Sequence, residues 1–238
     1  MSVRVVAIIA AAGSGERFGR PGGKQLATLA GATVVEHAAR PILACGRVDG
    51  VVVVTREEDV PAFLQLFADA PKVIGVVAGG ETRQDSVRAG LAAVPPSAEV
   101  VVVHDGARPL VTAEAVEAVL EALGPGVDAA VVGHPSVDTV KSVDHDGFVV
   151  KTEDRQRLWL VQTPQAFRVD ALSAALERAA EAGTVATDEA ALIESAGGRV
   201  RVVAGSRDNI KVTVPEDLAV AEALLMRRAE ADEQRRSS

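Results

Sequence analysis

Aromatic residues are scarce in this sequence of 238 residues, which has no tyrosine, one tryptophan and an aromatic content of 3%. Proteins that hold single-stranded nucleic acid stack the bases on aromatic side chains, and few are available here. The net charge of −8 also argues against a general binder of nucleic acid or of an anionic membrane surface. We therefore expect neither nucleic acid nor a membrane among the partners of this chain.

Cysteine is nearly absent, since Cys45 is the only one. A single cysteine excludes an internal disulfide and a cysteine-based zinc cluster, as is typical of a reducing compartment. The apolar run at residues 5–9 is short and a glycine-rich basic loop follows at once, so we interpret it as a buried strand and not as a signal peptide. No other segment is apolar enough to span a bilayer, and we predict a cytoplasmic location.

The sequence does have a regular alternation of apolar runs and amphipathic segments. Hydrophobic residues make up 48% of it, enough for a sizeable core. Continuous apolar runs predict strands buried on both faces, as in a parallel sheet, and the segments between them have apolar residues at helical spacing. We predict strands at residues 5–9, 51–54, 73–77, 100–103, 129–132 and 200–204. The predicted fold is α/β, a Rossmann-like and mostly parallel sheet with helices on both faces, in a single domain over residues 1–238.

The alternation breaks between residues 135 and 153. A turn signal, DHDG at residues 144–147, lies between two β-prone segments and predicts a β-hairpin. An isolated hairpin is only marginally stable in water, so this one must pack on its own core or on a second subunit. We interpret the charged residues 154–158 as solvated, Trp159 as a packing anchor, and TPQ at residues 163–165 as a turn.

The loop that follows the first strand, residues 10–24, concentrates glycines and cations. Its five glycines free the backbone to approach a ligand. The loop has three basic residues, Arg17, Arg20 and Lys24, and only one acidic residue, Glu16. Backbone amides together with cations form a polyphosphate site. The glycine spacing fits neither a Walker A loop nor a dinucleotide fingerprint, and a plain surface turn with solvated arginines is the alternative.

Two further polar loops follow predicted strands, at residues 79–86 and 104–109. Parallel order brings such loops to one edge of the sheet, where ligands bind. Asp105 follows four valines and is placed either to hold Mg²⁺ or to cap a turn. His104 is expected to be structural, and Arg108 to pair with Asp105 or Glu81.

Chemistry without a protein nucleophile is the prediction for these loops. They contain no credible Ser-His-Asp or Cys-His set, whereas they do contain cations and a candidate metal ligand. Phosphoryl-type transfer needs mainly positioning and charge stabilisation. Lys211 alternates with Ile210 and Val212, which indicates a charge at the rim of apolar packing or an edge-strand lysine.

The polar motifs, taken together and in order, resemble those of 2-C-methyl-D-erythritol 4-phosphate cytidylyltransferases. The resemblance extends over nearly the whole chain, and its middle and C-terminal motifs are more specific than the opening loop, which many sugar-nucleotide pyrophosphorylases share. The motifs are AAGSGER at residues 11–17 with KQ at 24–25, GGETRQDSV at 79–87, HDGARP at 104–109, DTVK at 138–141, TPQ at 163–165, TDE at 187–189 and DNIKVT at 208–213.

The resemblance implies a reaction and a set of residue roles. CTP and methylerythritol phosphate would give CDP-methylerythritol and pyrophosphate, with Mg²⁺, in isoprenoid precursor synthesis. It also implies a nucleotidyltransferase-type sheet with a protruding β-hairpin arm at residues 136–159, which crosses to a second subunit in a homodimer. The implied residues are Arg17 and Lys24 for charge stabilisation; Ala11, Ala12, Gly13, Gly80, Asp85, Ser86 and Asp105 for the nucleotide; Thr139, Arg155, Thr163, Thr187 and Lys211 for methylerythritol phosphate; and Asp105 with Asp208 for the metal.

The resemblance implies further that Arg155 and Lys211 aim the acceptor phosphate, with Arg155 acting in the neighbouring subunit's site. This sequence departs from the family at Ala10 and at Gly22-Gly23, where relatives often have proline. A ribitol 5-phosphate cytidylyltransferase is the close alternative, to be distinguished by the acceptor pocket. A nucleotide-binding regulator without turnover is the alternative from another class, and a dinucleotide oxidoreductase fits less well.

Overall fold

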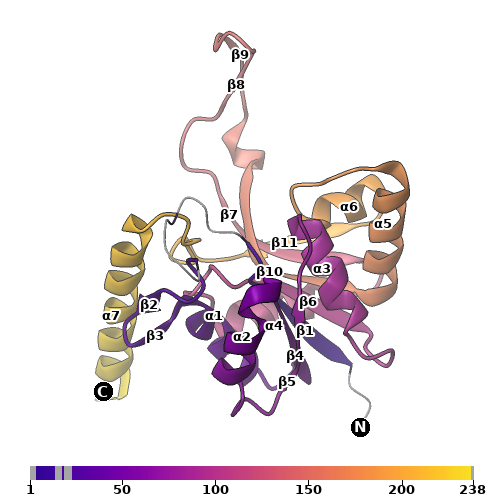
Figure 1. Cartoon of the computed structure of the whole chain (residues 1–238). Coiled ribbons are helices and arrows are strands. Elements are labelled where there is room, and N and C mark those ends of the chain that lie inside the picture. Colours follow the sequence, from indigo (N-terminus) through magenta and orange to yellow (C-terminus); the bar gives the residue numbers. More distant parts are fainter. Residues whose placement is uncertain (1–3, 14–17, 19–22, 237–238) are drawn as a thin grey trace.

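The computed structural model describes residues 4–13, 18 and 23–236. Arg17 and Arg20, predicted to be cations of the opening loop, lie outside the described residues. A central sheet lies between two layers of helices, and one β-hairpin arm projects away from the body (Figure 1).

The central sheet has seven strands in the order β11-β7-β10-β6-β1-β4-β5. All neighbouring strands are parallel except β10, which is antiparallel to both β6 and β7. The predicted mostly parallel sheet is therefore confirmed. The strands are β1 Val5–Ala10, β4 Gly50–Thr55, β5 Val73–Ala78, β6 Val100–Asp105, β7 Ala129–Pro135, β10 Trp159–Arg168 and β11 Val200–Ala204.

Helices cover both faces of this sheet. Successive residues of each strand point to opposite sides, and because most of the strands are largely apolar, both sides have apolar side chains to bury. Ala7 and Ile9 of β1 pack in one apolar cluster with α1, α2 and α4, whereas Val6 and Ile8 pack in the other with α3, α5 and α6. A third cluster joins α7 to residues near the opening loop. The helices are α1 Val34–Ala44, α2 Val60–Leu66, α3 Arg83–Ala92, α4 Ala113–Ala122, α5 Val169–Ala182, α6 Glu189–Ser195 and α7 Glu216–Arg236, with 3₁₀ turns η2 Glu57–Asp59 and η3 Arg155–Arg157.

Side-chain caps fix where helices begin. Thr33 and Glu36 form a capping box at α1, and Thr82 and Asp85 form one at α3. The box at α3 also fixes the direction in which Arg83, the first residue of that helix, leaves the loop.

The arm (residues 136–159) contains the predicted hairpin, with strands β8 Lys141–Val143 and β9 Val149–Thr152. A second small hairpin, β2 Thr28–Leu29 with β3 Ala32–Thr33, follows the opening loop. All residues of β8 and β9 are exposed, and the arm extends beyond the other elements (Figure 1). Phe148 and Val150 are 72% and 70% exposed. The arm therefore has an apolar surface that the described part of this chain does not cover.

Strand β10 corrects two predictions. Residues 163–165 are not a turn but part of β10, and Trp159 is not a packing anchor but the first residue of that strand, 38% exposed. A proline is rare inside a sheet because it has no N–H to donate. Here the pairing of β10 with β7 shifts register between Val161 and Gln165, so Pro164 falls in the irregular stretch.

Among the described residues, we find no helix that combines the length and the apolar character needed to cross a membrane.

Candidate active site

Two neighbouring cavities open at the carboxyl edge of the sheet. The first has a volume of about 560 Å³ and the second of about 290 Å³. They share three lining residues, Arg83, Asp105 and Lys211, which we call the boundary cluster. The first cavity is also lined by residues 10, 12–13, 24–25, 56–58, 79–82, 86 and 107, and the second by residues 108, 161–163, 165 and 187–188.

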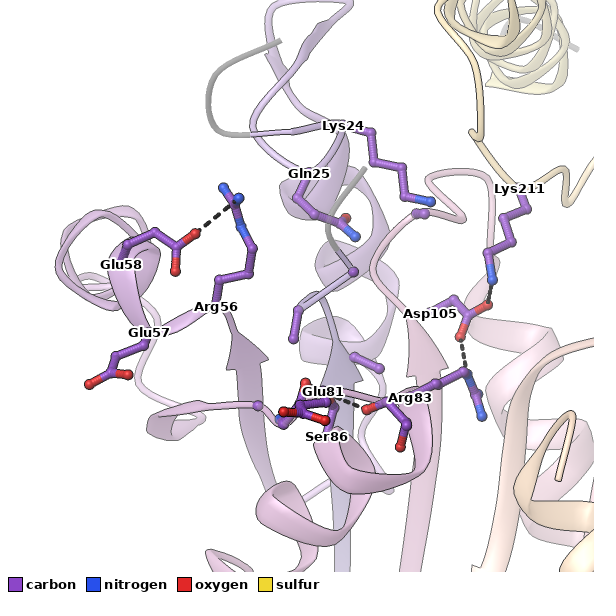
Figure 2. Close-up of a pocket in the computed structure, with 17 residues that line it drawn as sticks. Lys24, Gln25, Arg56, Glu57, Glu58, Glu81, Arg83, Ser86, Asp105 and Lys211 are labelled. Carbon is purple, nitrogen blue, oxygen red and sulfur yellow. Dashed lines mark hydrogen bonds and ion pairs between the residues drawn. The ribbon is translucent and has the colours of Figure 1, made fainter. Parts of the chain in front are cut away.

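Strand register explains why loops far apart in the sequence meet at the first cavity. Ala10 at the end of β1 is paired with Asp105 at the end of β6. On the other side of β1, Thr55 of β4 is paired with Ala78 of β5. The loops that leave these four strands therefore lie along one edge, as predicted for parallel strands. Figure 2 shows Lys24 and Lys211 entering the cavity from different elements on the same side.

Asp105 is the centre of the boundary cluster. Its Oδ1 accepts a hydrogen bond from Arg83 Nε at 3.1 Å, and its Oδ2 lies 2.7 Å from Lys211 Nζ and 3.9 Å from Arg108 Nε. Burial by itself raises the pKa of Asp105, but attraction by Arg83, Lys211 and Arg108 outweighs burial and lowers the pKa well below its usual value. Asp105 is therefore ionised at any physiological pH.

Arg83 joins this carboxylate to a second one. Its Nη1 donates to Oε2 of Glu189, the first residue of α6, whose carboxylate is buried. Burial lowers the pKa of Arg83, but Asp105 and Glu189 more than compensate, so the net pKa of Arg83 is raised. Arg83 thus remains a cation with its guanidinium held on two edges.

His104 and Thr163 hold the backbone on which Asp105 is placed. Thr163 Oγ1 accepts from the Asp105 N–H at 3.0 Å and lies 2.9 Å from His104 Nδ1, while His104 Nε2 lies 3.2 Å from the Arg108 carbonyl. A carbonyl only accepts, so Nε2 has the proton and Nδ1 accepts from the Thr163 hydroxyl. Burial lowers the pKa of His104 to about 4, which keeps the ring neutral. The predicted structural role of His104 is confirmed.

Most of the residues predicted for the nucleotide line the first cavity: Ala12, Gly13, Gly80, Ser86 and Asp105. Lys24, predicted for charge stabilisation, lines it as well. Close approach explains the glycines at its floor, because a Cβ on Gly79 would come within 2.6 Å of Ala12 Cβ and one on Gly80 within 2.4 Å of Asp85 Cβ. At these two positions a side chain would therefore push apart the loop and the start of α3, so glycine keeps the lining of the cavity in place.

Ala11 and Asp85 do not line the first cavity. The side chain of Ala11 is 2% exposed in the apolar core, and its N–H donates to the Val54 carbonyl at 2.7 Å. Asp85 has its carboxylate turned to the α3 cap, where Oδ2 accepts from Thr82 N–H at 3.2 Å and from Thr82 Oγ1 at 2.7 Å. Both residues shape the loop and do not present side chains to the cavity.

The residues predicted for the acceptor divide into two groups. Thr163, Thr187 and Lys211 line the second cavity. Thr139 and Arg155 lie on the arm and line neither cavity of their own chain, and Arg155 Nη1 donates to the Val137 carbonyl at 2.8 Å. The hydroxyl of Thr163 is already bonded on the side of Asp105 and His104.

The two predicted metal ligands, Asp105 and Asp208, have different surroundings. Asp208 lines neither cavity, and its Oδ2 accepts from Arg227 Nη2 at 2.5 Å. Within residues 4–13, 18 and 23–236 no group of three or more His, Cys, Asp or Glu side chains could hold a metal ion. A single carboxylate does suit Mg²⁺ when phosphate and water oxygens complete the coordination shell. Asp105, which faces both cavities, fits that mode and Asp208 does not.

Three charged residues at the site were not assigned a role from the sequence. Arg83 belongs to the motif at residues 79–87 and is the first residue of α3. A basic residue in the first turn of a helix is unfavourable next to the helix dipole unless anions surround it. This position is therefore the feature of the sequence that could have indicated acidic partners for Arg83. Glu189 is buried against it. Arg56 lines the first cavity and is held by Glu58 at 3.0 Å and Asp59 at 2.6 Å.

Known proteins share both the sequence and the fold. The family profile described as 2-C-methyl-D-erythritol 4-phosphate cytidylyltransferase (IspD) matches residues 5–227. A protein of that name from Pelotomaculum thermopropionicum is 46% identical over 228 residues, covering 94% of this chain and 95% of the relative. A protein of the same name from Symbiobacterium thermophilum is 44% identical over 225 residues, covering 94% of both chains.

Solved structures agree with the sequence relatives. The 4-diphosphocytidyl-2C-methyl-D-erythritol synthase of Anaerococcus prevotii superimposes with a TM-score of 0.85 at 31% identity, covering 95% of this chain and all of that chain. The cytidylyltransferase of Thermus thermophilus gives a TM-score of 0.76 at 31% identity, with 95% of this chain and all of that chain covered. By profile, sequence identity and fold, the chain belongs to the 2-C-methyl-D-erythritol 4-phosphate cytidylyltransferase family.

Proposed function

We propose that the first cavity holds CTP, that the second holds methylerythritol phosphate, and that the two react at the boundary cluster. As a member of its family the chain is a nucleotidyltransferase that transfers CMP from CTP to 2-C-methyl-D-erythritol 4-phosphate. The observation that carries the proposed arrangement is that Arg83, Asp105 and Lys211 line both cavities.

The residues of the first cavity suit a nucleoside triphosphate. Gly79 and Gly80 line this cavity together with Ser86, so a base and ribose bound there would meet backbone groups and a small side chain. Lys24 enters from the opening loop and gives a positive charge for the triphosphate. In this arrangement the α-phosphate lies toward Lys211, at the edge that both cavities share.

The reaction needs no protein nucleophile. An oxygen of the acceptor phosphate attacks the α-phosphorus of CTP and forms the new P–O bond, while the bond from the α-phosphorus to the bridging oxygen breaks and pyrophosphate leaves with its electron pair. Negative charge moves onto the leaving group, and positioned cations stabilise it. Lys24 and Lys211 act in that role, and Arg83 orients Asp105 between them.

Mg²⁺ is the proposed cofactor, and Asp105 would hold it. When bound, Mg²⁺ would neutralise part of the triphosphate charge. The cations that now contact Asp105 are compatible with this, because a triphosphate offers them new anionic partners while the Asp105 carboxylate stays ionised.

A homodimer formed through the arm is part of the proposal. The arm presents Phe148 and Val150 to solvent, and a two-stranded hairpin has little stability alone. Thr139 and Arg155 lie on this arm, outside the cavities of their own chain. We place them at the second cavity of the neighbouring subunit, where Arg155 meets the acceptor phosphate. A cytoplasmic location is also proposed, because a chain with one cysteine forms no internal disulfide.

A pyrophosphate-release assay tests the substrates. The purified protein is given CTP and Mg²⁺ with a panel of polyol phosphates that includes methylerythritol 4-phosphate, ribitol 5-phosphate and erythritol 4-phosphate. We expect release with methylerythritol phosphate and little with the others. Preference for ribitol phosphate, or release that does not depend on an acceptor, would contradict the proposal.

Subunit mixing tests the role of the arm. Lys24→Ala and Arg155→Ala variants, each of low activity alone, are mixed and allowed to exchange subunits. If Arg155 serves the neighbour's site, a mixed dimer contains one site with both residues intact, and activity returns. Verified mixed dimers without recovery would place Arg155 in its own chain's site.

A further inference from the structure

The start of α3 holds the segment 184–189 by three contacts. Gln84 Nε2 donates to the Thr184 carbonyl at 3.2 Å, and Gln84 Oε1 accepts from the Ala186 N–H at 3.3 Å. Next to it, Arg83 Nη1 donates to Glu189 Oε2. The loop that lines the first cavity and the segment that lines the second are therefore tied together at the boundary between them.

Glu189 is built into this contact and is not a surface charge. Glu189 is only 1% exposed, and it occupies the first position of α6, where the helix dipole favours a carboxylate. A buried carboxylate is costly unless it is paired. The cation that pairs with it, Arg83, also lines both cavities.

The geometry of the guanidinium explains what this contact does. Arg83 donates from Nε to Asp105 Oδ1 and from Nη1 to Glu189 Oε2, so two edges of one rigid plane are fixed. With only the bond to Asp105, the plane could turn about that bond. If the guanidinium turned in this way, the position of the Asp105 carboxylate and of the groups that react beside it would change as well.

We propose that Glu189 is a positioning residue for cytidylyl transfer, acting through Arg83, which it holds in one orientation across the boundary between the two cavities. This rests on the proposed placement of CTP and the acceptor. Glu189 touches neither cavity itself. Its effect should therefore appear in turnover more than in CTP binding, for which the proposed contacts are mainly those of the opening loop, Gly80 and Ser86.

Glu189→Gln is the test, because it keeps the shape and removes the charge. We expect kcat to fall about tenfold with the KM for CTP changed less than about threefold, since a small displacement of reacting groups costs turnover. Glu194→Gln is the matched control: Glu194 lies on the same helix and is exposed, so kcat should stay at the parent value. Melting temperature is measured for both.

A double-mutant cycle distinguishes action through Arg83 from general loosening. If Glu189 acts through Arg83, adding Glu189→Gln to Arg83→Lys should cost little beyond Arg83→Lys alone. Losses that multiply, or full activity of Glu189→Gln, would overturn the proposal. If Glu189→Gln does not fold, Glu189→Asp keeps the charge and shortens its reach, and a folded Glu189→Asp enzyme with parent kcat would overturn it equally. Failure of the parent protein to release pyrophosphate would instead refute the proposed function.

Discussion

Replacing Lys211 by methionine should remove one of the charges that act on the reacting phosphates. Lys211 Nζ lies 2.7 Å from Asp105 Oδ2 at the edge shared by both cavities. A unit charge about 4 Å from a phosphate oxygen is worth roughly 4 kcal/mol at an effective dielectric constant of about 20. The Lys211 side chain is 38% exposed, so water screens part of this attraction. We expect a loss of roughly 2–3 kcal/mol in transition-state stabilisation, which is about a hundredfold in kcat/KM.

The assay is steady-state pyrophosphate release with both substrates varied. Stability should change little, because Arg83 still pairs with Asp105 at 3.1 Å. Lys72→Met is the matched control: Lys72 precedes β5 at the opposite edge of the sheet, where its Nζ donates to the Cys45 carbonyl at 2.8 Å. Lys211→Met with kcat/KM within about threefold of the parent would refute the assignment of Lys211 to charge stabilisation.

Three further predictions concern stability, pH and assembly. Thr163→Val leaves the buried Asp105 N–H without its acceptor, so the free energy of unfolding in urea should fall by about 1–3 kcal/mol, whereas Thr187→Val, at an exposed residue, should change it little. His104 is protonated below about pH 6.5 in the unfolded chain and only near pH 4 in the folded chain, so the free energy of unfolding should fall by about 2 kcal/mol between pH 7 and pH 5 because of this residue. A folded His104→Gln variant whose free energy of unfolding has the same pH dependence as the parent would contradict this. Phe148→Ser on the arm should shift sedimentation from dimer to monomer, and Val185→Ser, similarly exposed but off the arm, should not.

Much of the fold could be predicted because local patterns agree with it. The valine runs of β4 and β6 are buried on both faces, and only a sheet covered on both sides gives such strands. The hairpin at residues 144–147 likewise forms where the turn signal predicts it, between β8 and β9. The convergence of the loops after β1, β5 and β6 follows from parallel order alone, so the position of Asp105 was predictable.

What could not be predicted depends on contacts between distant residues. The pairing of Arg83 with Glu189 joins positions 106 apart in the chain, and neither residue shows its partner in its own surroundings. Pro164 made residues 163–165 resemble a turn, whereas the register shift in β10 accommodates it within the sheet. Asp85 lies in a polar loop at the carboxyl edge of the sheet, where a ligand-binding carboxylate is expected, but its carboxylate caps α3.

A crystal structure of the protein with CTP bound is the most direct test of the claim that two anionic substrates meet at the boundary cluster. We predict the triphosphate in the first cavity, with Lys24 Nζ and Lys211 Nζ within hydrogen-bond distance of its oxygens and the base beside Gly80 and Ser86. A bound CTP whose triphosphate lies away from Asp105 and Lys211, so that the base and not the triphosphate is next to the second cavity, would contradict it.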